Sequence, residues 1–240
     1  MAGAEAQIGP AIAGLRLLGV IAALAPAPAF AGAWVAPEGG QEIWTTVAGE
    51  REGLSFFESS AYLETPLDER SSLVAAPTFE QNYDTLEGWR GEAVIGLKGV
   101  AFRDDNTAVA VQGGAFWTSH PAEGCEEGGG EIRLLVGNSF TAFGQNGFLN
   151  VEGAVRALSG DCRSQRVELT AGYRAWENWL AMGQVFVDAP HEGDETVKAQ
   201  LTITYFQRNG AGVQLGLRAR IDGGSEEAAL VLGLWGRPGD

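Results

Sequence analysis

Polar side chains, many of them charged, recur at every second position of otherwise apolar segments in this chain. Arg166 and Glu168, for example, alternate with Val167 and Leu169. Side chains two positions apart share one face of a β-strand, so each such segment has one charged and one apolar face. The charged face carries Glu58, Glu64, Arg90, Glu92, Lys98, Arg133, Glu152, Arg156, Arg166, Glu168, Arg174, Lys198, Arg218 and Arg220. Ladders of Arg and Glu can bind or repel a hydrophilic solute, which is the chemistry that this pattern predicts.

The charged face cannot lie against lipid, because a charge at the bilayer midplane costs about 2 to 4 kcal/mol. If the apolar face meets lipid, the charges line an enclosed lumen. Two arrangements of that lumen fit these residue types. The charges line a water-filled pore that acts on a solute, or they neutralise one another in a salt-bridge network that plugs the interior.

The elements that would position these charges are long β-strands. Strands of soluble sandwiches usually have about 5 to 6 residues, whereas a tilted strand needs about 9 to 11 residues to cross a bilayer. We predict strands near residues 41–49, 54–65, 70–79, 88–101, 107–117, 131–142, 147–158, 165–175, 179–188, 195–206, 211–221 and 228–236. About twelve strands, an even number, indicate an all-β, antiparallel, up-and-down transmembrane β-barrel.

The connections between the predicted strands alternate in length. Outer-membrane barrels have short periplasmic turns and longer outer loops. Even-numbered connections such as 103–106 and 176–178 are short, whereas odd-numbered ones such as 120–130 and 189–195 are long and acidic. Tyr and Trp near the strand ends are typical of the membrane–water interface. We predict Tyr62, Trp176, Trp179, Tyr205 and Trp235 at the periplasmic rim, and Trp44, Trp89 and Trp117 at the opposite one.

Residues 1–31 are typical of a secretory signal peptide. Arg16 precedes the apolar stretch 17–25, and a small-x-small motif that ends at Ala31 supplies the cleavage site. We therefore predict export, cleavage after Ala31 and one barrel domain over residues 32–240.

The overall charge excludes one class of partner. The chain holds 31 Asp and Glu against 16 Lys and Arg, which gives a net charge of -15. Proteins bind nucleic acids by displacing counterions from phosphates with Lys and Arg. We therefore predict no nucleic-acid partner.

Candidate catalytic residues are few. The two histidines, His120 and His191, both lie in Gly-, Pro- and acid-rich connections. A serine hydrolase needs a base that is fixed beside its nucleophile, and the chain contains no GxSxG, HExxH or phosphate-binding Gly motif. We predict no catalytic residue, no metal site and no cofactor.

The two cysteines fall in connections that we assign to the outer face. Cys125 and Cys162 have no CxxC or Cys/His zinc spacing. In an exported protein, two such cysteines most simply form one disulfide. Two free thiols are the alternative.

Three short segments carry a resemblance to a known family. They are Gly32-Ala33-Trp34-Val35-Ala36-Pro37 with Gly39 and Gln41, Tyr62-Leu63-Glu64-Thr65-Pro66-Leu67, and Gly233-Leu234-Trp235-Gly236-Arg237. With these segments the chain resembles a family of small proteobacterial outer-membrane barrels that includes XagA-like proteins, which are associated with surface-polysaccharide loci. The resemblance implies an outer-membrane barrel with a polysaccharide connection.

The predicted location is the outer membrane of a Gram-negative bacterium. The expected partners are outer-membrane lipid and lipopolysaccharide, the barrel-assembly machinery and a surface polysaccharide. We predict a porin-like channel that passes or binds a hydrophilic solute, with a saccharide as one candidate. The alternatives are a plugged structural or adhesion barrel that presents acidic, disulfide-tied loops, an outer-membrane hydrolase, and a soluble periplasmic β-protein.

Overall fold

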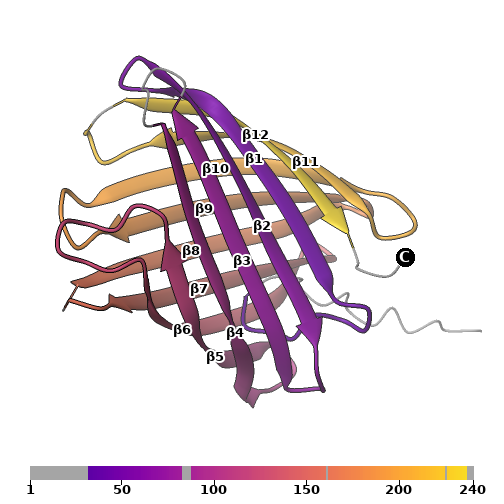
Figure 1. The fold of residues 1–240 in the computed structure, drawn as a ribbon. Coiled ribbons are helices and arrows are strands. Elements are labelled where there is room, and N and C mark those ends of the chain that lie inside the picture. Colours follow the sequence, from indigo (N-terminus) through magenta and orange to yellow (C-terminus); the bar gives the residue numbers. More distant parts are fainter. Residues whose placement is uncertain (1–31, 83–87, 161, 225, 237–240) are drawn as a thin grey trace, which may run out of the picture.

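The computed structural model describes residues 32–82, 88–160, 162–224 and 226–236. These residues form a closed barrel of twelve antiparallel strands (Figure 1). The strands are β1 (Gln41–Arg51), β2 (Leu54–Pro66), β3 (Ser71–Asn82), β4 (Trp89–Arg103), β5 (Thr107–Thr118), β6 (Gly128–Ala142), β7 (Gln145–Leu158), β8 (Cys162–Trp176), β9 (Trp179–Ala189), β10 (Thr196–Phe206), β11 (Gly212–Arg220) and β12 (Glu227–Gly236). The predicted fold class is therefore confirmed, while the predicted signal segment 1–31 lies outside the described residues.

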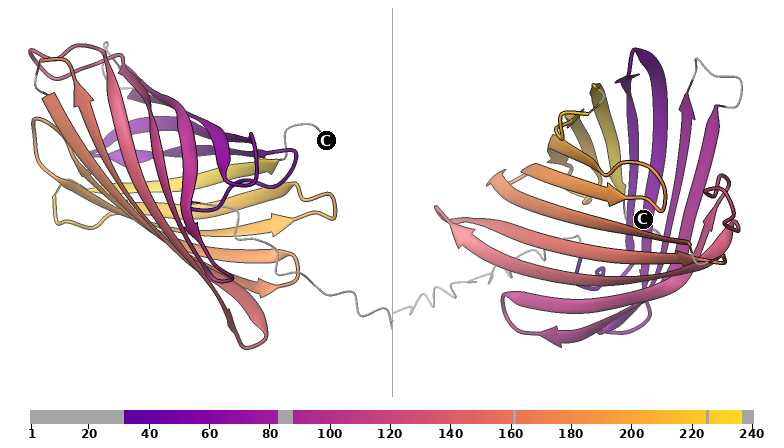
Figure 2. Two further views of the ribbon diagram at one scale, coloured as in Figure 1. Left: turned by 90° about the horizontal axis from the view of Figure 1, so that it is seen from below. Right: turned by 90° about the vertical axis from the view of Figure 1, so that its left-hand side faces the viewer.

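Every strand pairs with its neighbours in the sequence, and the first strand pairs with the last. The β1–β12 ladder runs from Glu42 opposite Gly236 to Arg51 opposite Glu227. Indigo β1 and yellow β12 therefore lie side by side (Figure 1), and Figure 2 shows the strands wrapping around a common interior. Closure removes the unpaired strand edges that an open sheet would expose.

Apolar side chains lie on the outside of the barrel and many polar side chains lie inside it, which is the reverse of a soluble barrel. Outward apolar side chains are exposed, with Leu201 at 71% and Ile132 at 68%, whereas the inward Thr204 and Asn150 are almost fully buried. A continuous exposed apolar band around a polar interior is the pattern of a transmembrane barrel. This barrel is an outer-membrane protein, as predicted. Within the described residues, no helix could cross a membrane.

The two ends of the barrel differ in their connections. At one end, which we call the short-turn end, the hairpin between β6 and β7 turns through Phe143 and Gly144, both with positive φ. Two-residue turns with positive φ match the right-handed twist of strands. Because the number of strands is even, β1 begins and β12 ends at this same end. The other end, the long-loop end, carries the connections 119–127 and 190–195.

The barrel wall is not equally tall all round. Strands β4, β6 and β8 each have 15 residues, whereas β11 and β12 have 9 and 10. Strands β6 and β8 begin three residues earlier than predicted, at Gly128 and Cys162. Cys162 therefore begins the tall strand β8, while Cys125 lies in the loop that precedes the tall strand β6.

Aromatic side chains at the strand ends follow the prediction only in part. Trp176 at the short-turn end and Trp89 at the long-loop end are more than half exposed on the outer surface. Tyr62 and Trp235 were predicted at the interface, but both face the lumen, where they bind Glu64 and Gln214. Trp44 pairs with Leu234 near the short-turn end, not the opposite one. In these three cases aromatic residue type was a poor guide to the face or the end of the strand.

Candidate functional site in the barrel lumen

One ion-pair cluster lies on the wall formed by β4, β6 and β7. Arg156 donates to Glu131 at 2.7 Å and to Glu92 at 3.0 Å. Arg133 donates to Glu131 at 3.0 Å and to Glu152 at 2.8 Å. The Glu131 side chain is only 1% exposed. The cluster is therefore an alternating chain of carboxylates and guanidiniums along the wall.

A second cluster joins β1, β2, β10, β11 and β12 around Glu227, whose side chain is fully buried. Glu227 accepts hydrogen bonds from Arg51 at 2.8 Å and from Arg218 at 3.0 Å. Arg218 also forms a two-point contact with Glu58, at 2.8 and 3.0 Å. Lys198 lies 3.6 Å from Glu227. Such forked Arg–carboxylate pairs have fixed geometry as well as strength.

A third cluster lies towards the short-turn end. The Lys98 ammonium on β4 is 2.7 Å from the Glu64 carboxylate on β2, and both side chains are buried. The same ammonium donates to the carbonyl oxygens of Gly32 at 3.0 Å and Trp34 at 2.7 Å. Glu64 in turn accepts from the Ala36 N–H at 3.0 Å. This ion pair therefore binds the chain that precedes β1.

Residues 32–36, which we call the N-terminal segment, lie inside the barrel. Ala33 is fully buried against inward side chains of β4, β5 and β6, with Trp34 and Val35 packed beside it. A Cβ atom at Gly137 would lie 2.2 Å from the Trp34 ring, so this close approach requires glycine. The segment fills the part of the short-turn mouth that adjoins β4, β5 and β6.

Charged side chains pack closely on the wall of β6, β7 and β8. The gap that Arg133, Glu152, Arg166 and Glu168 bound there leaves no water-sized space. A barrel of twelve strands lies between side-chain-filled barrels of eight strands and open porins of 16 to 18, a size that favours a narrow lumen.

Uncharged polar side chains lie between the charged clusters and the short-turn end on β9, β10 and β11. Gln200 donates to Gln184 at 2.9 Å, and Gln214 accepts from Trp235 at 2.9 Å. The buried hydroxyls of Thr202 and Thr204 have no partner among the described protein atoms. Amide groups such as those of the three glutamines can exchange hydrogen bonds with water or with the hydroxyls of a solute.

A cavity of about 430 Å³ opens at the short-turn end, beside the N-terminal segment. Arg174, Arg208, Phe206 and Trp235 are among the residues that line it. The Arg174 guanidinium lies 5.5 Å from the centre of the Phe206 ring, which meets the Trp235 ring edge-on. Aromatic side chains with a few polar groups are typical of small-molecule sites of this volume.

The structure places most of the predicted lumen residues in these clusters and three of them elsewhere. The clusters, with Arg166 beside Asp188 and Glu168 beside Thr170, include Glu58, Glu64, Glu92, Lys98, Arg133, Glu152, Arg156, Arg166, Glu168, Lys198 and Arg218. Arg90 lies half-exposed at the long-loop rim, beside Glu92. Arg220 pairs with Asp222 at that rim, and Arg174 binds the Glu177 carbonyl at the short-turn end.

Sequence reasoning missed three members of the clusters. Glu131 has the same parity as Arg133, so the alternation could have identified it. Arg51 and Glu227 were predicted to lie just beyond strand ends, but β1 and β12 extend to pair these two residues with each other. The sequence Glu52-Gly53 could have indicated this, because these two residues alone form the turn and so leave Arg51 within the strand.

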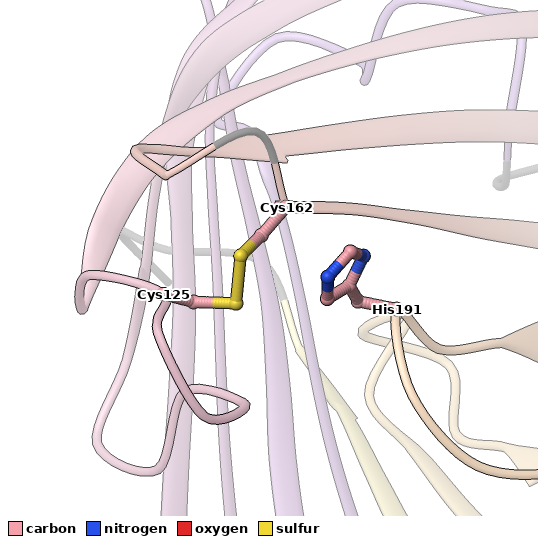
Figure 3. A group of neighbouring side chains, drawn as sticks. All are labelled: Cys125, Cys162 and His191. Atoms are coloured by element: carbon pink, nitrogen blue, oxygen red, sulfur yellow. A yellow bond between two sulfur atoms is a disulfide. The ribbon is translucent and has the colours of Figure 1, made fainter.

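The disulfide prediction is confirmed. Cys125 and Cys162 are bonded, and His191 lies beside the bond (Figure 3). The three side chains could otherwise hold a metal ion, but metals bind the thiolate, and sulfurs that are bonded to each other are not thiolates. In the oxidised protein this group therefore ties the β5–β6 loop to the start of β8.

Removal of this bond is expected to have a moderate effect. Cys125→Ser/Cys162→Ser should lower the free energy of unfolding by about 2 kcal/mol, at the low end of the usual range for a disulfide. The low value follows because the intervening β6–β7 hairpin already limits the loop in a denatured state with residual structure. Urea unfolding of the two proteins in lipid vesicles measures the difference, and an unchanged midpoint would contradict the stapling role.

Asp222, in the loop between β11 and β12, makes the long-loop rim sensitive to acid. The Arg220 guanidinium and the N–H groups of Val197 and Gly224 lower the pKa of Asp222 from 3.8 to about 2. Because the folded pKa is the lower one, the stabilisation is fully present above pH 3.8 and is lost as pH falls through about 2. Asp222→Asn should therefore be less stable than the native protein at pH 7 and equally stable below pH 2. Urea unfolding at both pH values tests this, and a constant difference would contradict it.

The histidines show no hydrolase arrangement. His120 contacts Ser119, its neighbour in the chain, at 2.7 Å, and His191 accepts from the Arg163 N–H at 3.3 Å. Within the described ranges, no carboxylate or amide side chain orients either ring, as a catalytic base would require.

No protein-family model matches this chain, and neither does any curated protein sequence. Solved structures do match it. The chain is similar to an outer-membrane channel from Pseudomonas putida F1, with a TM-score of 0.58 and 10% identity over 85% of this chain and 97% of that chain. The NanC porin gives 0.56 and 10% over 80% and 98%, and the KdgM porin gives 0.53 and 6% over 80% and 97%. This chain has the fold of small outer-membrane porins. Identities this low show the fold alone, so the resemblance to XagA-like proteins stays a prediction.

Proposed function

We propose that this protein is a narrow porin-like channel for a hydrophilic solute. The observation that carries the proposal is the large set of polar side chains inside the barrel, from the rim pair Arg220–Asp222 and the Glu227 cluster to Gln214 and the cavity at the short-turn end. A barrel that served only as a scaffold could fill its interior with apolar side chains, which often stabilise as well as buried ion pairs do.

A saccharide is the solute class that we favour. Sugar hydroxyls donate and accept hydrogen bonds, and the amides of Gln184, Gln200 and Gln214 offer matching groups. The KdgM porin has been solved in complex with oligogalacturonate, which supports a saccharide on this fold. The resemblance to XagA-like proteins supports a surface polysaccharide as the source of that saccharide. Lipopolysaccharide and the barrel-assembly machinery remain the expected partners in the membrane.

A plugged structural barrel is the second candidate, and one observation favours it. Glu131, Glu227 and Arg218 are each less than 8% exposed although they face the lumen. In that case the disulfide-tied loops at the long-loop end would be the functional surface.

Swelling of liposomes that contain the purified protein distinguishes the two candidates. We expect swelling in a monosaccharide that slows steeply as the sugar becomes larger, because the lumen is narrow. Arg133→Gln should change the rate, because Arg133 lies inside the barrel between Glu131 and Glu152, whereas Arg163→Gln at the exposed start of β8 should not. Folded protein whose liposomes swell no faster than empty ones would contradict the channel.

A further inference from the structure

The N-terminal segment is held in the lumen by side chains and not by strand pairing. Within the described part of the chain, no backbone hydrogen bond joins residues 32–36 to a strand. The polar contacts that hold it come from Lys98, which binds the carbonyls of Gly32 and Trp34, and from Glu64, which binds the Ala36 N–H. A segment attached in this way can leave the wall without breaking the barrel.

Lys98 and Glu64 hold the segment with hydrogen bonds that occupy all three N–H donors of the Lys98 ammonium. The three N–H donors of an ammonium match three short contacts of Lys98, with Gly32, Trp34 and Glu64. Glu64 also accepts from Tyr62 and Ser72 on the barrel wall. If the segment left, the Lys98 ammonium would lose two of these acceptors while its own position stayed fixed by Glu64.

The tip of the segment ends at a second polar group. The Gly32 backbone lies so close to Asn150 that a Cβ atom there would be 2.1 Å from Asn150 Oδ1. That buried oxygen has no hydrogen-bond partner within the described structure. A buried acceptor without a hydrogen-bond partner costs free energy, and this cost persists while the segment covers Asn150. Departure of the segment would expose Asn150 to water and remove the cost. The unpaired oxygen therefore favours departure of the segment, whereas the contacts with Lys98 and Glu64 favour its retention.

The segment also borders the open part of the mouth. Pro37, Gly40 and Gln41, which continue the chain from the segment into β1, line the cavity of about 430 Å³. Movement of residues 32–36 away from β4, β5 and β6 would join the space that they occupy to that cavity.

We propose that residues 32–36 are a displaceable gate that sets the solute size limit of the channel, and that Lys98 and Glu64 hold it closed. This inference rests on the proposed channel function and adds to it the element that determines the pore size. A solute with carbonyl or hydroxyl oxygens at the mouth competes with the Gly32 and Trp34 carbonyls for the Lys98 ammonium.

Thiol labelling tests attachment of the segment without reference to transport. Both native cysteines are in the disulfide, so an introduced cysteine is the only free thiol. With a membrane-impermeant maleimide, Ala33→Cys should react at least tenfold more slowly than Glu38→Cys, since Ala33 is buried and Glu38 is exposed. Adding Lys98→Met should raise the Ala33→Cys rate at least tenfold, whereas Lys198→Met, the same change in the Glu227 cluster, should leave it unchanged. Equal rates at positions 33 and 38 in the native background would overturn the seated segment.

Single-channel conductance of the same variants tests the gate. Lys98→Met should raise the conductance at least twofold. Trp34→Ala should do the same, because it removes the packing of the segment but keeps the Lys98–Glu64 pair. This second variant tests the gate even if Lys98→Met fails to fold. If both variants conduct and their conductance equals that of the native protein, the gate is overturned and the channel is not. If every variant folds but none conducts, although Lys98→Met raises the labelling rate of Ala33→Cys as expected, both the channel and the gate are overturned.

Discussion

Lys98→Met is expected to lower the free energy of unfolding by about 3 to 5 kcal/mol, because it leaves a buried carboxylate without its partner. The Glu64 side chain is only 2% exposed while the N-terminal segment is in place, so water solvates its charge poorly there. The N-terminal segment loses two hydrogen bonds in the same variant. Urea titration of the barrel in lipid vesicles, followed by tryptophan fluorescence, measures the loss.

Two further variants show whether that loss comes from the ion pair. Lys98→Met/Glu64→Leu should recover most of it, because a buried pair replaced by apolar side chains is often neutral. Lys198→Met should cost about 1 kcal/mol or less, since Glu227 keeps Arg51 and Arg218. A double variant that is no more stable than the single one would contradict the account of an isolated buried charge.

Leu201→Arg is expected to cost about 2 to 4 kcal/mol, the penalty for a charge at the midplane of the lipid face of a barrel. Leu201 lies in the middle of β10 and is 71% exposed on the outer surface. In a soluble barrel the same exposed position would tolerate Arg with little effect. The measurement is again urea unfolding in lipid vesicles.

Leu67→Arg is the matched control. Leu67 is also highly exposed, but it lies in the turn between β2 and β3 at the short-turn end. Near the interface the penalty for Arg falls to about 0 to 1 kcal/mol. Equal costs at Leu67 and Leu201 would contradict the position of the membrane band.

The strands could be predicted because successive side chains of a transmembrane strand face lipid and lumen in turn, which gives the sequence a two-residue period of apolar and polar residues. β9 and β10 lie within one residue of their predicted ranges. The starts of β6 and β8 were placed too late, because Gly128, Gly129 and Gly130 have no side chains to alternate and the first residues of β8 extend beyond the apolar band. The parity of the lumen charges followed from the same period.

The ion-pair partners and the place of the N-terminal segment could not be predicted. Arg156 reaches Glu92 across two intervening strands, a contact that depends on register and on the shear of the closed barrel. Residues 32–36 have no strand period, so nothing local indicates that they turn into the lumen. Their burial depends on Lys98, which lies far along the chain.

The decisive test of the channel is single-channel recording of the mature protein in a planar bilayer, with and without oligosaccharides in the bath. We expect small, steady openings that oligosaccharides reduce from the side on which they are added, because the solute occupies the narrow lumen. A folded, heat-modifiable barrel that stays silent at every voltage would contradict the channel and favour the plugged barrel.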